Sequence, residues 1–453
     1  MIPQPSIVAT DDNGQHLDAI ARCIQKMGAS CLPLVFREGG ISLERELNAV
    51  RLLFFDLHYV PGTPRGPALY DIAAGVLEEI VRPGNGPYVL IIWSSHVGEY
   101  EDFLRHVSDG FPDIPPPSAS AFMDKTPFIV GGEGGDAIAE THFEALAQQI
   151  QAIIDGNPQV SALLNWEDTA RAAAGDVIDS ITGLVPREAC FLGESGPELE
   201  RLLLAVARAA VGKTSNIEAD RVYAINEGLG PILLDQLINA TAIRRAQAVD
   251  HWKSALPDLQ GPSQVTQDQK AALNASTLVS SRDISGVAAG DRGAVSALNP
   301  TPGENGSPTV LGRSHKELVG KYLDLLENNQ HRNEEREELL GSCRWVFVGY
   351  RAACDQSYQR GSYLRRVCLA LEVPSRFLDV FKPKKHGARY MSPEIRLNDE
   401  SVKLIFNWHF AVALTEAKLE SSEVQYRLRE PLISEIAISL HVHGFRPGII
   451  SYN

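Results

Sequence analysis

The sequence is poor in cysteine, has no excess of basic residues and contains no long apolar run. Its cysteines are scattered, with no Cys-x-x-Cys pair and no cysteine and histidine spacing that suits a structural zinc. They are Cys23, Cys31, Cys190, Cys343, Cys354 and Cys368. No apolar run approaches the roughly 20 residues that cross a bilayer, and the first residues lack the basic and apolar regions of a signal peptide. We therefore expect a cytoplasmic protein with reduced thiols and no membrane segment.

The charge balance is acidic. The formal net charge is -15, whereas a protein that coats nucleic acid needs Lys and Arg in excess over at least one face. The one basic cluster, residues 382–389, is interrupted by Pro383 and Gly387, which is typical of a solvated loop. We expect no nucleic-acid partner.

The length of the chain indicates several domains. Its 453 residues exceed one ordinary core, while 44% hydrophobic and 22% charged residues are usual for a globular protein. Composition and apolar periodicity divide the chain into four segments. These are an α/β domain over 1–157, a helical middle section over 158–253, a polar linker or mobile loop over 254–312, and a C-terminal α+β domain over 313–453.

The first segment alternates short apolar runs with helical periodicity, which predicts βα units around a doubly wound parallel sheet. Helices are expected between the strands, the clearest being the one that carries Leu17, Ile20 and Ile24 on one face before Gly28. Five strands are predicted, at 6–10, 31–36, 51–55, 88–93 and 118–123.

The C-terminal segment predicts strands and helices in alternation. We expect charged helices over 316–340, strands at 343–350, 366–373 and 402–410, and a last helix over about 422–440. Asn398-Asp399-Glu400 is typical of the turn of a hairpin that leads into the third strand.

Polar residues follow the predicted strands of the first segment. Asp11 and Asp12 follow the first strand, Asp56 the third, Ser94 the fourth and Lys125 the fifth. Because ligands of such sheets bind at the carboxyl ends of the strands, these side chains should meet at one edge. Carboxylates bind Mg²⁺, a hydroxyl can hold a phosphoryl oxygen, and a fixed cation balances the remaining negative charge. These residue types together are those needed to phosphorylate an aspartate.

Four motifs resemble the receiver domains of two-component response regulators: Ile7-Val-Ala-Thr-Asp-Asp12, Leu53-Phe-Phe-Asp56, Leu90-Ile-Ile-Trp-Ser94 and Phe122-Met-Asp-Lys125. The resemblance covers about the first third of the chain and implies a flavodoxin-like five-stranded sheet. It implies that Asp56 is the phosphoacceptor, and that Asp11, Asp12 and Asp56 bind Mg²⁺ together with the backbone carbonyl of His58. It also implies that Ser94 and Lys125 contact the phosphoryl group and that Phe122 is the switch aromatic.

This resemblance implies a phosphorelay protein that acts as a signalling switch or phosphate buffer rather than as a turnover enzyme. A histidine kinase would be the phosphodonor, and an effector protein would lie downstream. More weakly, the whole chain resembles receiver proteins of bacterial anti-phage two-component systems. The sequence leaves the oligomeric state open, with a homodimer among the options, and shows no DNA-binding helix-turn-helix signal.

Two other hypotheses remain open from the sequence. The first is a phosphorylation-gated hydrolase in the C-terminal segment that uses Cys354 or His409, although the spacing of Cys354, Asp355 and His409 does not support a set of nucleophile, orienting acid and base. The second is an inert pseudo-receiver that serves as an interaction scaffold.

Two further motifs are given no site. His441 and His443 could share one face of a strand but lack an evident third metal ligand. Gly212-Lys213-Thr214 lacks the preceding strand and glycine of a phosphate-binding loop, and is interpreted as a helix end.

Overall fold

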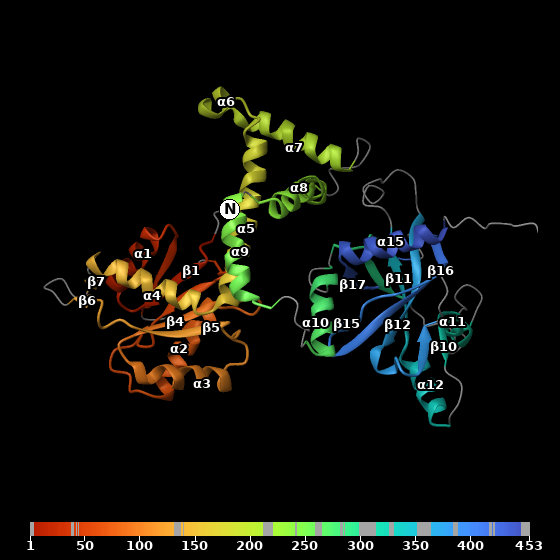
Figure 1. The fold of residues 1–453 in the computed structure, drawn as a ribbon, viewed down its shortest axis with the longest axis horizontal. Helices are drawn as coiled ribbons and strands as arrows, with labels where there is room; N and C mark the ends of the chain where they lie inside the picture. The colour runs from red at the N-terminus through yellow and green to blue at the C-terminus, as the bar shows by residue number, and fades with distance from the viewer. Residues whose placement is uncertain are drawn as a thin grey trace, which may run out of the picture. The chain divides into compact units, whose positions relative to one another are not determined.

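The structure is a computed structural model in which the chain forms two compact units (Figure 1). The first unit comprises Met1–Ser180 and Leu233–Gly261, and the second comprises Ile181–Ile232 and Pro262–Asn453. The residues described are 4–37, 40, 41, 43, 45–130, 137, 138, 140–211, 221–240, 242–258, 265–280, 284, 286–298, 314–325, 330–350, 364–383, 388–415, 419 and 422–444.

The first unit is built on a five-stranded sheet in which every pairing is parallel, in the order β2-β1-β3-β4-β5. This confirms the α/β class and the five predicted strands. The strands are β1 Ile7–Asp11, β2 Cys31–Val35, β3 Leu52–Phe55, β4 Val89–Ser94 and β5 Ala119–Asp124. Strands β3 and β4 are buried along their whole length, as expected when helices cover both faces of a sheet. A short hairpin, β6 Ile129–Val130 with β7 Ala137–Ile138, follows β5.

Helices pack on both faces of this sheet. One face carries α1 Gly14–Lys26 and α4 Phe143–Asp155, and the other carries α2 Pro67–Ile80 and α3 Tyr100–Gly110. Helix α1 begins where the Asn13 side chain accepts a hydrogen bond from the Gln15 amide, and it buries the predicted apolar face.

The expectation of a helix between every pair of strands is wrong at one place. Between β2 and β3 the described residues form no helix, and Arg37 and Gly40 make an isolated bridge instead. Gly40 has φ 109° and Ala49 has φ 62°, so the backbone leaves the helical region near both ends of this segment. Leu47 and Val50 of this segment still reach the core.

The middle section is helical, as predicted, and its helices are divided between the two units. They are α5 Pro158–Thr182, α6 Arg187–Leu192, α7 Ser195–Val211, α8 Arg221–Ile238 and α9 Ala242–Ala255. Within the first unit, Glu167 of α5 accepts a hydrogen bond from Arg51 at 2.5 Å, and Asp176 of α5 pairs with Arg244 of α9 at 2.6 Å. These pairs fasten α5 to the loop before β3 and to α9. Gly212-Lys213-Thr214 lies outside the described residues.

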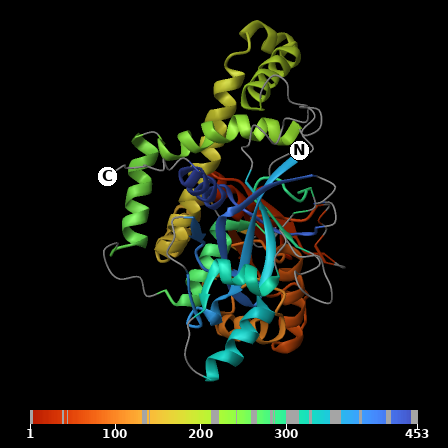
Figure 2. The same cartoon turned by 90° about the vertical axis from the view of Figure 1, so that its right-hand side faces the viewer.

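The second unit contains an antiparallel sheet in the order β14-β16-β12-β11-β9-β17-β8, with β15 paired to β16 (Figures 1 and 2). Its strands are β8 Val279–Ser280, β9 Ala294–Ala297, β11 Arg344–Gly349, β12 Leu364–Pro374, β14 Arg389–Met391, β15 Ile395–Leu397, β16 Glu400–Thr415 and β17 Val424–Leu428. Strands β11, β12 and β16 confirm the three predicted strands, and Asn398, with φ 52°, lies in the predicted turn.

Helices cover both faces of this second sheet. Residues of α11 His315–Tyr322 and α12 Gln330–Ser342 join the core on one face. Residues of α10 Gln267–Leu278 and α15 Glu430–Gly444 pack on the other face. Strands β10 Leu323–Leu325 and β13 Phe381–Pro383 pair antiparallel and form a separate two-stranded sheet in this unit. The basic cluster spans the end of β13 and the start of β14, with residues 384–387 outside the described part of the chain.

Two predictions for the C-terminal half need correction. The segment 254–312, expected to be a linker or mobile loop with only a short helix around 270–278, contains that helix as α10, but it also contributes β8 and β9, and β9 pairs with both β11 and β17. The last predicted helix starts later, because residues 424–428 form β17 and α15 begins at Glu430. In both cases short strands are held by neighbours that are distant in sequence, since β9 pairs with β11 and β17, and β17 also pairs with β8.

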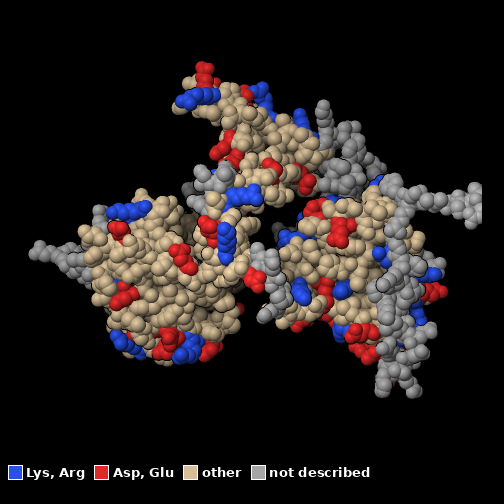
Figure 3. Space-filling view, in the orientation of Figure 1, with Lys and Arg blue, Asp and Glu red and all other residues tan. Residues whose placement is uncertain are grey.

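The surface and the helices agree with the charge and hydropathy of the sequence. On the face drawn in Figure 3, Lys and Arg side chains lie among Asp and Glu side chains. Among the described helices, none combines the length and the apolar character that a membrane crossing requires.

Candidate functional site

The residues predicted to act together are placed at the carboxyl ends of four adjacent strands. Asp11 is the last residue of β1 and Ser94 the last of β4, whereas Asp56 directly follows β3 and Lys125 directly follows β5. The parallel register aligns these ends, since the Asp56 amide donates to the Thr10 carbonyl at 3.1 Å and the Lys125 amide donates to the Ser94 carbonyl at 3.2 Å. The sheet edge therefore assembles residues from four separate parts of the sequence.

Lys125 lies between two of the carboxylates. Its Nζ is 3.0 Å from Asp56 Oδ2 and 3.4 Å from Asp11 Oδ2. Each carboxylate is also fixed by the backbone, because the Leu57 amide donates to Asp56 at 2.8 Å and the Asn13 amide donates to Asp11 at 2.8 Å. Asp11, Asp56 and Lys125 are all buried, so their geometry is set by the fold rather than by solvent.

Three carboxylates form a cluster suited to a divalent cation. One oxygen each from Asp11, Asp12 and Asp56 lies within 4.8 Å of the other two. The single lysine leaves an excess of negative charge, and hard cations such as Mg²⁺ prefer carboxylate oxygen ligands. Asp12 is exposed while the other two are buried, so the cluster has an open side. These residues fit the predicted Mg²⁺ site, and the His58 carbonyl as a further ligand stays a prediction.

The ionisation of the cluster reflects its burial and its crowding. Burial raises the pKa of Asp56, and Asp11 adds to that effect, although Lys125 opposes it. Burial also raises the pKa of Asp12 to about 6, with a further contribution from the adjacent Asp11. For Asp11, burial works in the same direction, but His16 and Lys125 outweigh it and lower its pKa. In the folded chain the charged form of Asp56 is therefore more costly than in water.

This cost predicts a stability gain when the Asp56 charge is removed. Because the Asp56 pKa is raised on folding, its contribution to stability is complete in acid and is lost as pH rises through the folded pKa. Asp56→Asn should therefore raise the Tm of the metal-free chain near neutral pH by roughly 2–4 °C, equivalent to about 1 kcal/mol. The gain should shrink as pH falls.

The measurement is thermal unfolding in EDTA across a pH series. Asp113→Asn, which changes an exposed carboxylate, is the matched control and should leave the Tm unchanged at every pH. A lower Tm for Asp56→Asn at neutral pH would show that its carboxylate stabilises the fold, which contradicts this account.

Ser94 and two histidines lie around a pocket of about 280 Å³ that opens over Asp56. The pocket is lined by Asp12, Asp56, His58, Val60, Pro61, Gly62, Ser94, Ser95, His96 and Lys125. Ser94 is buried, and its hydroxyl accepts a hydrogen bond from the His96 amide at 3.3 Å. The pocket thus contains a carboxylate, a hydroxyl and a cation at one place.

A network at the pocket mouth was missed by the sequence reasoning. His58 Nε2 lies 2.6 Å from Glu99 Oε2, and the His58 and His96 rings are 4.5 Å apart. Arg65 contacts both Glu99, at 2.8 Å, and His96, at 3.1 Å. The two histidines each stand two positions after a site residue, which is a signal that the sequence offered. Glu99, on the short helix Val97–Glu99, gave no such signal.

Phe122 lies on β5, two positions before its last residue. The ring is partly buried against the core on the α2 and α3 face, and its centroid is 6.2 Å from that of Tyr100. The Tyr100 hydroxyl donates to Ser120 at 2.8 Å. The ring is therefore close to the surface of β5 and α3, and its role as a switch stays a prediction.

The other candidates from the sequence gain no site. Cys354 and Asp355 lie outside the described residues. His441 and His443 lie on α15, not on a strand as expected. The His443 ring instead faces His409, with centroids 5.5 Å apart. Within the described ranges, the acidic cluster of the first unit is the one group whose atoms could surround a metal.

No protein-family model, curated protein or solved structure matches this chain. The fold and the chemistry of the site therefore have to carry the functional assignment.

Proposed function

We propose that the first unit is a flavodoxin-like receiver domain in which Asp56 accepts a phosphoryl group with the help of Mg²⁺. The strand order 2-1-3-4-5 is that of flavodoxin-like sheets, in which ligands bind at the carboxyl ends of the strands where the order reverses. Asp11 of β1 and Asp56 after β3 stand at that point. The observation that carries the proposal is the contact of Lys125 with Asp56 inside a cluster of three carboxylates.

In the proposed reaction an Asp56 oxygen attacks the phosphorus of the donor and forms an acyl phosphate. The bond between phosphorus and the donor breaks, and the donor leaves with that electron pair and takes up a proton. A phosphohistidine of a kinase is the donor that the receiver class predicts. Asp11, Asp12 and Asp56 would hold Mg²⁺, which offsets the charge of the phosphoryl oxygens.

The remaining residues act on the phosphoryl group once it is on Asp56. Lys125, already 3.0 Å from the Asp56 oxygen, is placed to neutralise negative charge that develops there. Ser94 is placed to donate its hydroxyl to a phosphoryl oxygen, because both line the same pocket. The phosphoryl group on Asp56 adds negative charge that would attract the Ser94 hydroxyl. Movement of Ser94 would change the packing beside Phe122 and so transmit the phosphorylation state to the surface of the domain. We propose either a switch or a phosphate buffer as the biological role.

The test is phosphorylation of the full-length chain by acetyl phosphate, followed by intact-mass spectrometry. With Mg²⁺ present we expect one phosphoryl adduct per chain, and with EDTA we expect none, because three crowded carboxylates repel an anionic donor. Brief alkaline treatment should remove the adduct, since acyl phosphates are labile to base. Absence of any adduct in Mg²⁺, with acetyl phosphate and with a phosphorylated histidine kinase, would leave an inert scaffold as the better description.

A further inference from the structure

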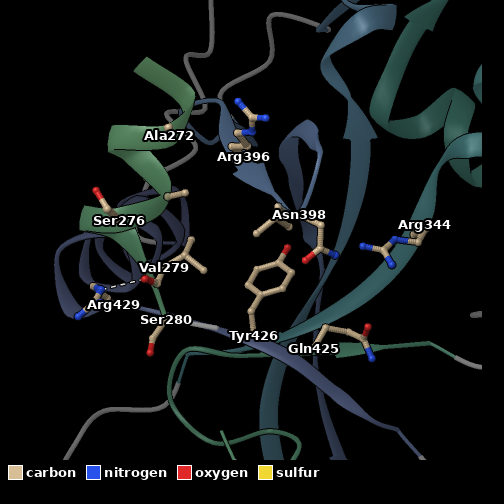
Figure 4. Close-up of a pocket in the computed structure, with 12 residues that line it drawn as sticks. Ala272, Ser276, Val279, Ser280, Arg344, Arg396, Asn398, Gln425, Tyr426 and Arg429 are labelled. Atoms are coloured by element: carbon tan, nitrogen blue, oxygen red, sulfur yellow. Dashed lines mark hydrogen bonds between the residues drawn. The ribbon is translucent and has the colours of Figure 1, made fainter. Parts of the chain in front are cut away.

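A pocket of about 600 Å³ in the second unit does not bring its charged groups together (Figure 4). Its arginines, Arg344, Arg396 and Arg429, lie on three separate sides, with Tyr426 and Asn398 between them. One small anion cannot contact guanidinium groups that are placed in this way. The pocket over the acidic cluster of the first unit differs, because its polar side chains surround one position, and two of them have no role in the proposed reaction.

Those two side chains are His58 and His96, which line the pocket beside Asp56, Ser94 and Lys125. Their ring centroids are 4.5 Å apart. The His96 amide donates to the Ser94 hydroxyl at 3.3 Å, so the backbone of His96 is held next to the group that is proposed to bind a phosphoryl oxygen. His96 is therefore part of the pocket wall where that oxygen would lie.

The contacts of the two rings place their protons differently. His58 Nε2 lies 2.6 Å from a carboxylate oxygen of Glu99, and because a carboxylate only accepts, the ring proton of His58 is used in that hydrogen bond. His96 Nδ1 lies 3.1 Å from a terminal nitrogen of Arg65, and because a guanidinium group only donates, Nδ1 is the acceptor and the proton is on Nε2. The described residues offer no hydrogen-bond partner to His96 Nε2, so its N–H is available to a ligand.

Glu99 fixes this arrangement. It is only 5% exposed, and its second carboxylate oxygen lies 2.8 Å from Arg65 Nε. The planar guanidinium group of Arg65 is thus held by Glu99 through one nitrogen and contacts His96 through another, although the Arg65 side chain is 68% exposed. Arg65 does not line the pocket, so it occupies the edge of the His96 ring that faces away from the pocket and leaves the Nε2 edge toward it.

The electrostatics of this network suit a phosphoryl ligand. A cation that donates to Nδ1 polarises the imidazole ring and makes the Nε2–H of His96 a stronger donor. A phosphoryl group carries three strong acceptor oxygens, and Lys125 and Ser94 supply two side-chain donors for them. Arg65 also brings a positive charge to the mouth of a pocket in which three carboxylates repel an anionic phosphodonor.

We propose that His96 is a further catalytic residue of the receiver reaction, whose Nε2–H donates to an oxygen of the phosphoryl group that is transferred to Asp56. Arg65 and Glu99 are its positioning residues. His58 differs from His96, because Glu99 takes its ring proton. This inference rests on the function proposed for Asp56 and adds a specific donor to that site.

The experiment measures the affinity of the full-length chain for beryllofluoride, a phosphoryl analogue, in Mg²⁺ by fluorine NMR. His96→Ala should weaken beryllofluoride about tenfold, the usual effect of removing one hydrogen bond to a charged group. His96→Gln keeps an N–H near the position of Nε2–H and should recover most of the affinity. His106→Ala, which changes a partly exposed histidine of α3 outside the pocket, is the matched control and should bind as the parent does.

Two further measurements separate this role from a structural one. The Mg²⁺ affinity of His96→Ala without beryllofluoride, measured by calorimetry, should equal that of the parent, because the imidazole is not one of the clustered carboxylates. Nitrogen NMR of the metal-free parent should show His96 protonated at Nε2, whereas Arg65→Ala should show both tautomers. Arg65→Ala should also weaken beryllofluoride, by a smaller factor than His96→Ala.

The outcomes distinguish this inference from the function on which it rests. If the parent binds beryllofluoride and His96→Ala binds it equally well, the role of His96 is overturned while that of Asp56 stands. A parallel loss of Mg²⁺ affinity in His96→Ala, no recovery in His96→Gln, or a His96 proton on Nδ1 in the parent would overturn it as well. A parent that does not bind beryllofluoride in Mg²⁺ would contradict the function proposed for Asp56 and the role of His96 together.

Discussion

Replacing Asp56 with asparagine is expected to abolish phosphoryl uptake from acetyl phosphate. The amide of asparagine lacks the negative charge that makes the carboxylate a nucleophile, and among the described residues no other carboxylate has the same contacts with Lys125 and the Leu57 amide. Asp11 is engaged by His16 and Lys125. Asp12 is largely exposed, and the partial desolvation of its carboxyl group, together with the adjacent Asp11, raises its pKa to about 6. Intact mass of the variant after incubation with donor and Mg²⁺ should show only the unmodified chain.

Asp124→Asn provides the matched control for that variant. Asp124 ends β5 directly beside Lys125, but its carboxylate accepts a hydrogen bond from the Thr126 amide at 2.8 Å and does not line the pocket. This control should take up one phosphoryl group as the parent does. A normal adduct on Asp56→Asn, or its loss in Asp124→Asn, would place the acceptor elsewhere.

Replacing Lys125 with alanine should slow phosphorylation by about 10²–10³-fold, the usual effect of removing one preorganised donor to a developing charge. Its ammonium group is buried and contacts Asp56, and the two carboxylates outweigh burial and raise the pKa of Lys125. The lysine is therefore fully charged at neutral pH. The rate is measured as the rise of the phosphoryl adduct with time in excess acetyl phosphate and Mg²⁺.

Mg²⁺ binding separates this role from a structural one. Without the Lys125 ammonium group, the negative charge of the three carboxylates is not offset. Lys125→Ala should therefore bind Mg²⁺ at least as tightly as the parent, which is measured by calorimetry. Lys125→Arg keeps the charge but changes the shape of the donor and should recover only part of the rate. Weaker Mg²⁺ binding together with a normal phosphorylation rate in Lys125→Ala would contradict the role given to Lys125.

The acidic site could be predicted because its residues follow rules of sequence and topology. Parallel strands that are buried on both faces appear as continuous apolar runs, and β3 and β4 have that form. Once the strands are located, the residues after them must share one edge of the sheet. As that rule requires, the Lys125 Nζ lies 3.4 Å from an Asp11 oxygen and 3.0 Å from an Asp56 oxygen.

The parts that could not be predicted depend on contacts between distant segments. Strand β9 is four residues long and is held between β11 and β17, and nothing in its Ala-Val-Ser-Ala sequence marks it as a strand. Leu47 and Val50 have helical spacing, yet they reach the core from an irregular segment. The contact of His58 with Glu99 joins residues 41 positions apart, and only the fold brings them together.

The most direct test of the central claim is to locate the phosphoryl group on the chain. Full-length protein is phosphorylated with acetyl phosphate and Mg²⁺, reduced with borohydride, digested and sequenced by tandem mass spectrometry. Borohydride converts an aspartyl phosphate to homoserine, so we predict homoserine at Asp56 and unmodified side chains at Asp11 and Asp12. Homoserine at another aspartate, or an unmodified Asp56 in a sample that carries the phosphoryl adduct, would contradict the account.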